Sequence, residues 1–349
     1  MDVLSAFPVL AADAGQKAQL VTEGFSAWAS WIILFAPLAV AFLVAAVPPI
    51  RRHVNVAAGL AVGSVILGLL LTIFVYFIPS FEGAKTWEYI VPWVVIDGQT
   101  IISFGARMDA LALTMTLVVT GVGSAIFVYA LGYMKGDPSM GRFYGKFALF
   151  VFSMLGIVIS PNFFQTFIFW ELVGASSYLL IGYYWKKDSA GEAAKKAFMT
   201  NRVGDFGFLL GILMIWAAVG AHLDVYDPGN FGAFDFGVIQ RAYEGIGASQ
   251  LFTGGVAVAA IAAALIFCGA MGKSAQFPLH VWLPDAMEGP TPVSALMHAA
   301  TMVAAGIYMI VRCNFVIYGM DWAPTLIAWL GGITALIAAS MAITQNDIK

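Results

Sequence analysis

The sequence predicts an all-helical protein that crosses a membrane many times, and three observations point to this class. Hydrophobic residues make up 61% of the 349 positions and charged residues only 11%, which is more apolar than the core of a soluble domain requires. The apolar stretches reach the length of about 17–25 residues that a helix needs to span a bilayer. They also lack the alternation of apolar and polar residues that is typical of membrane β-barrels.

Nine stretches of this kind follow one another along the chain. Their approximate ranges are 30–48, 55–79, 109–133, 143–160, 163–185, 197–220, 254–279, 293–312 and 323–344. We expect an N-terminal extension (1–28), helices one to three (29–135), a bundle of helices four to eight (136–322) and helix nine (323–349). The apolar patch in the extension lacks the basic residues that begin a signal peptide. A surface extension is therefore favoured over a cleaved signal.

The charges in the loops predict an orientation. Basic residues follow helices one, three and five, whereas the loops 80–108 and 221–250 are mainly acidic. By the positive-inside rule the basic loops face the cytoplasm, which places the N-terminus outside a bacterial inner membrane. The net charge of −3 comes with no basic patch, so we expect no nucleic-acid partner.

Ionisable residues inside the spans are candidates for function, because a charge at membrane depth costs about 2.5–3.5 kcal/mol. Glu171 lies well inside the fifth span. The sixth span contains Arg202 and Asp205, and their i, i+3 spacing places them on one helical face where they can pair. A neutral, hydrogen-bonded glutamate and a structural ion pair are the alternatives. If Glu171 faces the pair, the three residues form an electrostatic control element.

The seventh span is interrupted at Lys273. Glycines precede this lysine and prolines follow it, beginning with Pro278, so regular helical hydrogen bonding cannot continue. Broken helices at membrane depth are buried in protein or line a wet cavity. A carboxylate nearby would control whether Lys273 holds or releases its proton. Ser274 and Gln276 are placed to hold water beside it.

The eighth span carries His298, with Ser294 four residues before it and Thr301 three residues after it. This narrow polar stripe suits a path for protons, since histidine titrates near neutral pH and both ring nitrogens exchange protons. A hydrogen-bonded packing histidine is the alternative. The other histidines are scattered and the two cysteines are far apart, so neither a metal site nor an iron–sulfur cluster is predicted in this chain.

Several motifs in this half of the chain occur in a characteristic order. They are WELVG at 170–174, SYLLIG at 177–182, NRVGD at 201–205 and the run from Gly272 to Tyr308. Together they resemble the L subunit of respiratory complex I, called ND5 in mitochondria. The similarity covers about residues 100–349 and is weak in 1–28 and 221–250. It implies an antiporter-like half-channel with a proton-translocating role at the far end of the membrane arm, next to the M subunit.

The resemblance also implies roles for single residues. Glu171 matches the glutamate that modulates the pump, Lys273 the lysine that carries the proton, and His298 the histidine that links the half-channel to the central axis. Arg202 and Asp205 match a charged pair near that glutamate. The chain itself would bind no cofactor, so NADH, FMN, iron–sulfur clusters and quinone are expected in partner subunits of a NADH:quinone oxidoreductase.

Two alternatives remain open beside this interpretation. His298 and Ala304 favour the complex I subunit over its relative in multisubunit Na⁺/H⁺ antiporters, which tends to place a lysine at the second position. The other alternative is an inert fragment. Family members continue with more helices after the motif TQNDIK at 344–349. We therefore expect the second half of the channel on a longer gene product or on another chain.

Overall fold

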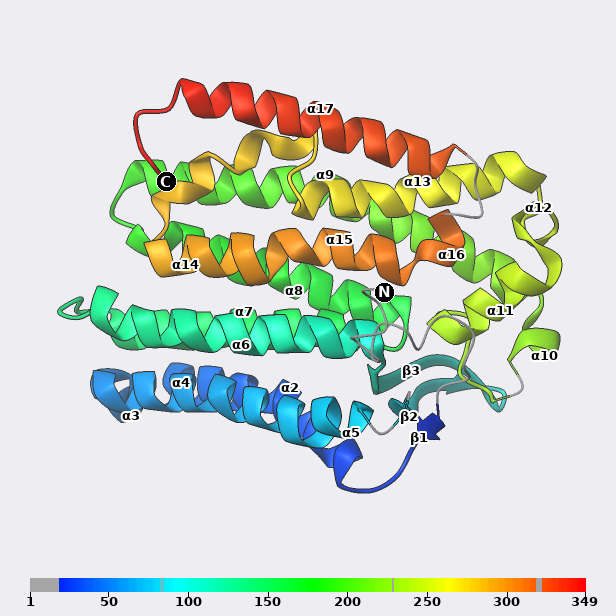
Figure 1. Ribbon diagram of the computed structural model, residues 1–349, viewed down its shortest axis with the longest axis horizontal. Coiled ribbons are helices and arrows are strands. Elements are labelled where there is room, and N and C mark those ends of the chain that lie inside the picture. The colour runs from blue at the N-terminus through cyan, green and yellow to red at the C-terminus, as the bar shows by residue number, and fades with distance from the viewer. Residues whose placement is uncertain (1–18, 82, 84, 228, 318–321) are drawn as a thin grey trace.

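The computed structural model describes residues 19–81, 83, 85–227, 229–317 and 322–349. Within these ranges, nine helices are long and apolar enough to cross a membrane. Figure 1 shows them side by side, with a β-hairpin and several short helices gathered at one end. We call this the hairpin end, and the opposite end, where the basic loops lie, the basic end. The predicted helical fold is confirmed, and residues 1–18 of the predicted extension lie outside the described residues.

The membrane helices alternate in direction between the two ends. In chain order they are α2 (Phe25–Ala46), α4 (Val54–Leu71) with its continuation to Ser80, α6 (Ala110–Tyr133), α7 (Met140–Ile159), α8 (Phe163–Ile181), α9 (Asp188–Gly220), α13 (Gly255–Lys273), α14 (Thr291–Ala295) continuing into α15 (Met302–Arg312), and α17 (Ala323–Ile343). Shorter helices are α3 (Pro48–Arg52), α5 (Ile78–Ser80), α10 (Leu223–Tyr226), α11 (Phe236–Ile246), α12 (Ala248–Leu251) and α16 (Asn314–Ile317). Most ends agree with the predicted ranges to within a few residues.

Helix α9 is the clearest exception, because it begins at Asp188 and not near residue 197. The added turns contain alanines and charged residues, which favour a helix even outside the apolar part of a membrane. Asp188 also lies in the first turn, where a negative charge interacts favourably with the helix dipole. The helix therefore extends past its apolar segment at the basic end.

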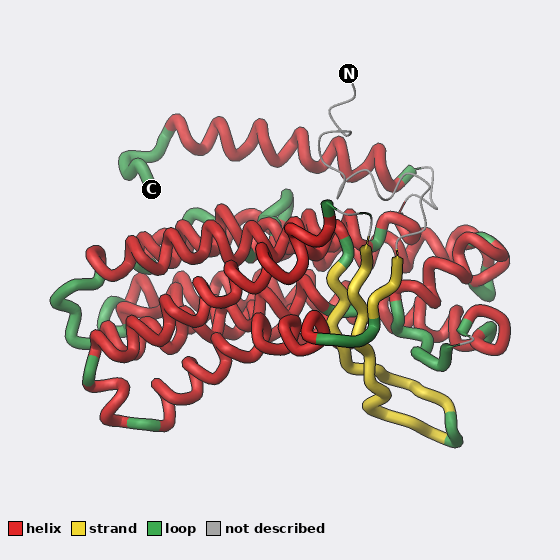
Figure 2. The backbone as a smooth tube through the Cα atoms, turned by 60° about the horizontal axis from the view of Figure 1, so that its bottom comes forward, coloured by secondary structure: helices red, strands yellow, loops and turns green. Residues whose placement is uncertain are grey.

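The segment 80–108, which we expected to be an acidic loop, contains a β-hairpin. Strand β2 (Lys85–Ile96) pairs antiparallel with β3 (Gln99–Met108), and the short β1 (Gln19–Val21) pairs parallel with the start of β2. Asp97 and Gly98 have φ values of 51° and 80°, as a two-residue Asp-Gly hairpin turn requires. Figure 2 shows the hairpin projecting beyond the ends of the neighbouring helices.

The hairpin holds the start of α8 in place. The Gln165 side chain accepts a hydrogen bond from the backbone N–H of Gly105 (2.9 Å) and donates one to its carbonyl (2.8 Å). The Asn162 amide donates to the carbonyl of Ser103 at 2.8 Å and its oxygen caps α8. These bonds satisfy buried polar groups on both partners. They fix the position of the helix that carries Glu171.

Helices α9 and α13 pack with their backbones in direct contact. A β-carbon at Gly204 would lie 2.7 Å from the Cys268 carbonyl oxygen, and one at Gly211 would lie 2.9 Å from the backbone nitrogen of Ile266. Small residues allow this close approach of membrane helices. As a consequence, α9 and α13 hold Asp205 and Lys273 at a short separation.

We expect Gly204→Ala to weaken this contact, because the new methyl group overlaps backbone that has little freedom to move. Overpacking of this kind costs about 1–3 kcal/mol. Gly191→Ala is the matched control on the same helix, since no atom lies within 4 Å of its β-carbon position. The measurement is the thermal stability of the membrane complex in detergent. Equal melting temperatures for the two variants would contradict the close-contact interpretation.

Candidate functional site

The break in the seventh span lies at the last residue of a helix. Helix α13 ends at Lys273, Ser274 leaves the helical region, and Ala275 has a positive φ of 49°. Short 3₁₀ turns at Leu279–Trp282 and Asp285–Glu288 then carry the chain to the basic end. The interruption predicted from the glycines and prolines is confirmed. A cation in the last turn is also favoured by the helix dipole.

Lys273 is completely buried and pairs with Asp205. Its Nζ lies 3.2 Å from Asp205 Oδ2, and the two side chains are 0% and 3% exposed. Trp170 donates a hydrogen bond from its indole nitrogen to Asp205 Oδ1 at 2.7 Å, and its ring centroid lies 5.8 Å from the lysine Nζ. A β-carbon at Gly174 would lie only 3.0 Å from the same nitrogen. The glycine therefore leaves room for the ammonium group.

Arg202 pairs with Glu171 and not with Asp205, so the pairing suggested by the i, i+3 spacing was wrong. The Arg202 guanidinium group donates a hydrogen bond to Glu171 on α8. Residues three apart on a helix are rotated by about 60° around its axis, which is enough to send these two side chains to different partners. The Arg202 side chain is 43% exposed, whereas that of Asp205 points into the bundle. Glu171 lies beside this pair of residues, as the resemblance implied.

Trp170 was missed by the sequence analysis. Trp170 comes directly before Glu171 in the WELVG motif, but its place in the motif does not indicate a contact with Asp205. A buried indole N–H needs an acceptor, and in an apolar span the few carboxylates are the obvious ones. That reasoning would have identified the contact.

The polar stripe on the eighth span does not form a connected chain of hydrogen bonds. Ser294 Oγ donates to the carbonyl of Thr291 at 3.0 Å, and Thr301 Oγ1 donates to the carbonyl of Leu296 at 2.6 Å. Neither ring nitrogen of His298 has a partner in the part of the chain that the structure describes, although both are buried. The helix widens into a π-turn at Leu296–Ala300, a distortion often found at functional sites.

Trp282 lies next to both the break and the histidine, and it too was missed. Its indole nitrogen donates to the carbonyl of Gly272 at 3.1 Å, and its ring centroid lies 6.4 Å from that of His298. The side chain is fully buried. Gly272, the residue before Lys273, and His298 therefore both lie beside the same tryptophan. A hydrogen-bonded path from Lys273 to His298 would need water to complete it.

The two polar residues after Lys273 contact other helices. Ser274 Oγ donates to the carbonyl of Val303 on α15 at 2.7 Å. Gln276 accepts a hydrogen bond from Thr334 on α17 at 3.3 Å. Both side chains thus tie the non-helical segment to its surroundings, and Ser274 links the break to the helix that follows His298.

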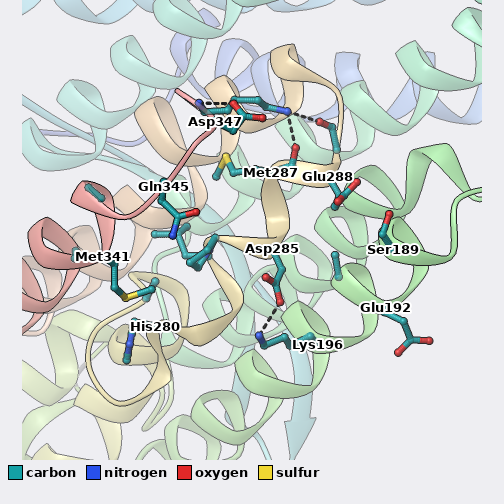
Figure 3. Close-up of a pocket in the computed structure, with 18 of the residues that line it drawn as sticks. Ser189, Glu192, Lys196, His280, Asp285, Met287, Glu288, Met341, Gln345 and Asp347 are labelled. Atoms are coloured by element: carbon teal, nitrogen blue, oxygen red, sulfur yellow. Dashed lines mark hydrogen bonds and ion pairs between the residues drawn. The ribbon is translucent and has the colours of Figure 1, made fainter.

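A cavity of about 1140 Å³ opens at the basic end and reaches the break. It extends from Lys349 to Ser274, the residue next to Lys273. Figure 3 shows the ion pair between Lys196 and Asp285 inside it, with 2.6 Å between Nζ and Oδ2. A space of this size, lined by polar groups, accommodates many water molecules.

Comparison with known families agrees with this architecture. Residues 160–349 match the model of the family described as "NADH:quinone oxidoreductase/Mrp antiporter, TM", and residues 93–144 match "NADH-Ubiquinone oxidoreductase (complex I), chain 5 N-terminus". The first match includes α8, α9, α13 and α15, and with them every residue of the site described above.

Curated relatives carry a corresponding name. NAD(P)H-quinone oxidoreductase chain 5 of Synechocystis sp. is 48% identical over 269 residues, which are 77% of this chain and 37% of the relative. The chloroplast subunit 5 of Mesostigma viride is 40% identical over 333 residues, which are 94% of this chain and 48% of the relative. The chain thus spans less than half the length of these relatives.

Solved structures show the same arrangement of helices. The Mrp complex of Dietzia sp. has a chain that matches with a TM-score of 0.72 and 25% identity, over 93% of this chain and 32% of that one. A chain of an archaeal membrane-bound sulfane sulfur reductase matches with a TM-score of 0.63 and 22% identity, over 85% and 55% of the two chains. With the family match extending over more than half of its length, the chain belongs to the transmembrane family of NADH:quinone oxidoreductase and Mrp antiporter subunits, and its relatives are chain 5 subunits, as the sequence motifs predicted.

Proposed function

We propose that this chain is part of a proton-translocating, antiporter-like subunit of the membrane arm of a NADH:quinone oxidoreductase. The observation that carries the proposal is the buried pair of Lys273 and Asp205 at the end of a broken helix. A lysine with no exposure at membrane depth is costly, and such residues mark ion and proton paths. The names of the relatives support the assignment to this complex over other members of the family.

The pairing of four charged residues supports a switch that controls the proton on Lys273. In the structure Arg202 binds Glu171 while Lys273 binds Asp205. Asp205 lies three residues from Arg202 on the same helix, so rotation of the arginine toward Asp205 would compete with the lysine for its counter-ion. Loss of a negative partner favours release of a lysine proton. Protonation or displacement of Glu171 would free Arg202 for this exchange.

The surroundings of Lys273 support a route for the released or captured proton. The cavity at the basic end reaches Ser274 and can supply water on one side. On the other side, His298 lies close to Trp282, and its two buried ring nitrogens have no partner among the residues that the structure describes. We propose that water links Lys273 to His298, with Thr301 shaping the widened helix turn. Under this proposal Glu171, Lys273 and His298 move protons and Arg202, Asp205, Ser274 and Thr301 support them.

The proposal includes partners, cofactors and a location. NADH, FMN, iron–sulfur clusters and quinone would be bound by other subunits, and the neighbour in the membrane arm would be the antiporter-like M subunit. The location we propose is a bacterial inner membrane, and the positive-inside rule supports an orientation with the basic end in the cytoplasm and the N-terminus outside. The relative from Mesostigma viride is named as chloroplastic.

A cation/proton antiporter subunit without a redox partner is the second candidate. The similarity to a chain of the Mrp complex, with a TM-score of 0.72, favours it. The two functions differ in what drives transport. Proton movement that requires NADH and quinone supports the first, and movement driven by a sodium gradient alone supports the second.

We expect Lys273→Met to lower NADH-driven proton pumping by roughly 10²-fold, the lower end of what loss of an acid–base group costs. Asp205 can take up a proton in this variant, so the complex should still assemble. Lys195→Met is the matched control, because Lys195 is exposed and binds Glu192 on its own helix. The measurement is the quench of a pH-sensitive dye in inverted vesicles. Pumping at the wild-type rate would refute the role of Lys273.

Two carboxylates next to the site should differ in their importance. Asp205→Asn removes the direct partner of Lys273 and should abolish pumping almost as completely as loss of the lysine. Glu171→Gln frees Arg202 to compete with Lys273 for Asp205 but removes neither member of the buried pair. A partial loss of roughly tenfold is therefore expected, smaller than the loss of an acid–base group causes. The ratio of protons pumped to NADH oxidised separates the two variants. A larger loss in Glu171→Gln would contradict the proposed order of control.

A further inference from the structure

Asp235, at the hairpin end, is a buried carboxylate outside the membrane helices. It begins α11, where its Oδ1 accepts a hydrogen bond from the backbone N–H of Val238 at 3.0 Å. The residue is 3% exposed. Its second oxygen, Oδ2, is buried and accepts no hydrogen bond within the described residues. Such a group differs from an ordinary helix cap, because half of its acceptor capacity is unused.

Charged groups from three elements face this carboxylate. Arg107 lies on β3, Arg241 on α11, and Glu88 on β2 opposite Arg107 in the sheet. A β-carbon at Gly237 would lie 3.2 Å from Asp235 Oδ1, 3.4 Å from Arg241 Nη1 and 3.7 Å from Arg107 Nη1. Both guanidinium groups therefore border the aspartate. The fourth neighbour, the start of α8, contributes the uncharged Asn162.

Each arginine also lies near another acceptor, and only Arg241 forms a hydrogen bond with it among the described residues. Arg241 Nε donates to the carbonyl of Tyr226 at 3.0 Å. Arg107 Nε lies 3.4 Å from Asp109 Oδ2, which is a long contact for a charged pair. Arg107 thus stands between two carboxylates and is weakly held by one of them.

Asp109 connects Arg107 to the eighth span. Asp109 binds the guanidinium group of Arg312 through both oxygens, with 2.9 Å between Oδ1 and Nη2. Although burial opposes ionisation, the charge of Arg312 holds the pKa of Asp109 well below its usual range. Arg312 also donates to the Tyr308 hydroxyl at 2.7 Å, which donates to the carbonyl of Val158 at 2.6 Å. Asp109 is therefore favoured in its ionised form where it binds Arg312 at the end of α15.

The environment of Asp235 also shifts the pH at which its carboxyl group binds a proton. Burial is the largest influence and raises the pKa of its carboxyl group to about 6. The charge of Glu88 acts in the same direction, while the bond from Val238 and the two arginines oppose it. The group is protonated below about pH 6 and ionised above it, whereas an unburied aspartate changes charge near about pH 4.

We propose that Asp235 is a proton-binding site at the hairpin end, and that its occupancy decides whether Arg107 is drawn toward Asp235 or stays with Asp109. When ionised, Asp235 attracts Arg107 and loosens its contact with Asp109. When protonated, it leaves Arg107 in place, so that Arg107 and Arg312 both bind Asp109 and stabilise the end of α15. Because α15 continues the span that carries His298, the pH at the hairpin end biases that span. Only this last step rests on the proposed function.

Infrared difference spectroscopy of the intact complex in membranes tests proton binding directly. Spectra taken between about pH 5 and about pH 7 should contain a carbonyl-stretch band of a protonated carboxylic acid that disappears as the pH rises. Asp235→Asn should remove this band, and asparagine still caps the helix. Asp224→Asn, which alters an exposed carboxylate in the same loop, should leave it unchanged. The same spectrum in wild type and in Asp235→Asn would overturn the proposal.

Two further variants test the neighbours. Arg107→Gln removes a positive charge and should raise the midpoint of the band by roughly one pH unit. Glu88→Gln removes a negative charge and should lower it. Midpoints that do not move, or that move in the opposite directions, would overturn the arrangement of charges.

The link to the eighth span is tested separately by pumping. Over the same pH range on the hairpin side, wild type should change its pumping rate and Asp235→Asn should lose this part of the response. If Asp235→Asn removes the infrared band but leaves the pH response of pumping unchanged, the proton-binding site is supported and its link to the eighth span is refuted. If Lys273→Met pumps normally, the proposed function fails, while the infrared result still stands.

Discussion

The charge on Lys273 is the constraint that the rest of the structure depends on. An ammonium group without exposure to water is stable only with a countercharge and further hydrogen bonds nearby. Asp205 supplies the countercharge, and Trp170 supplies a hydrogen bond to that carboxylate. These three residues come from three helices, so α8, α9 and α13 must all meet at one place. The glycines between α9 and α13 and the hairpin that holds the start of α8 serve this requirement.

Features that depend on local sequence were predictable. The lengths of the apolar stretches determined the helices, and the glycines and prolines around Lys273 determined the break. The hairpin was not predicted although its Asp97-Gly98 turn is a local signal, because the acidic charge of the segment also fits a loop. The ion-pair partners of Arg202 and Asp205 could not be predicted, since they depend on how α9 is rotated against α8 and α13. Spacing along one helix contains no information about that rotation.

The eighth span shows a second limit of sequence reasoning. The positions of Ser294, His298 and Thr301 suggested a polar path, but the hydroxyl groups of the serine and threonine bond to carbonyls of their own helix. Such local bonds compete with bonds to neighbouring side chains, and a sequence does not reveal which prevails. Trp282 lies beside both Gly272 at the break and His298. A path at this point therefore depends on water molecules and not on a fixed row of side chains.

The close contact of α9 and α13 has a consequence for the speed of any change at the site. Helices whose backbones touch at Gly204 and Gly211 have little room to slide, so they behave as one rigid body. The separation between the Cα atoms of Lys273 and Asp205 is then constant while their side chains rotate. Side-chain rotations are much faster than the microsecond-to-millisecond displacements of packed helices. Local reorganisation of this ion pair is therefore limited by rotamers and hydration, and slower steps must arise elsewhere in the assembly.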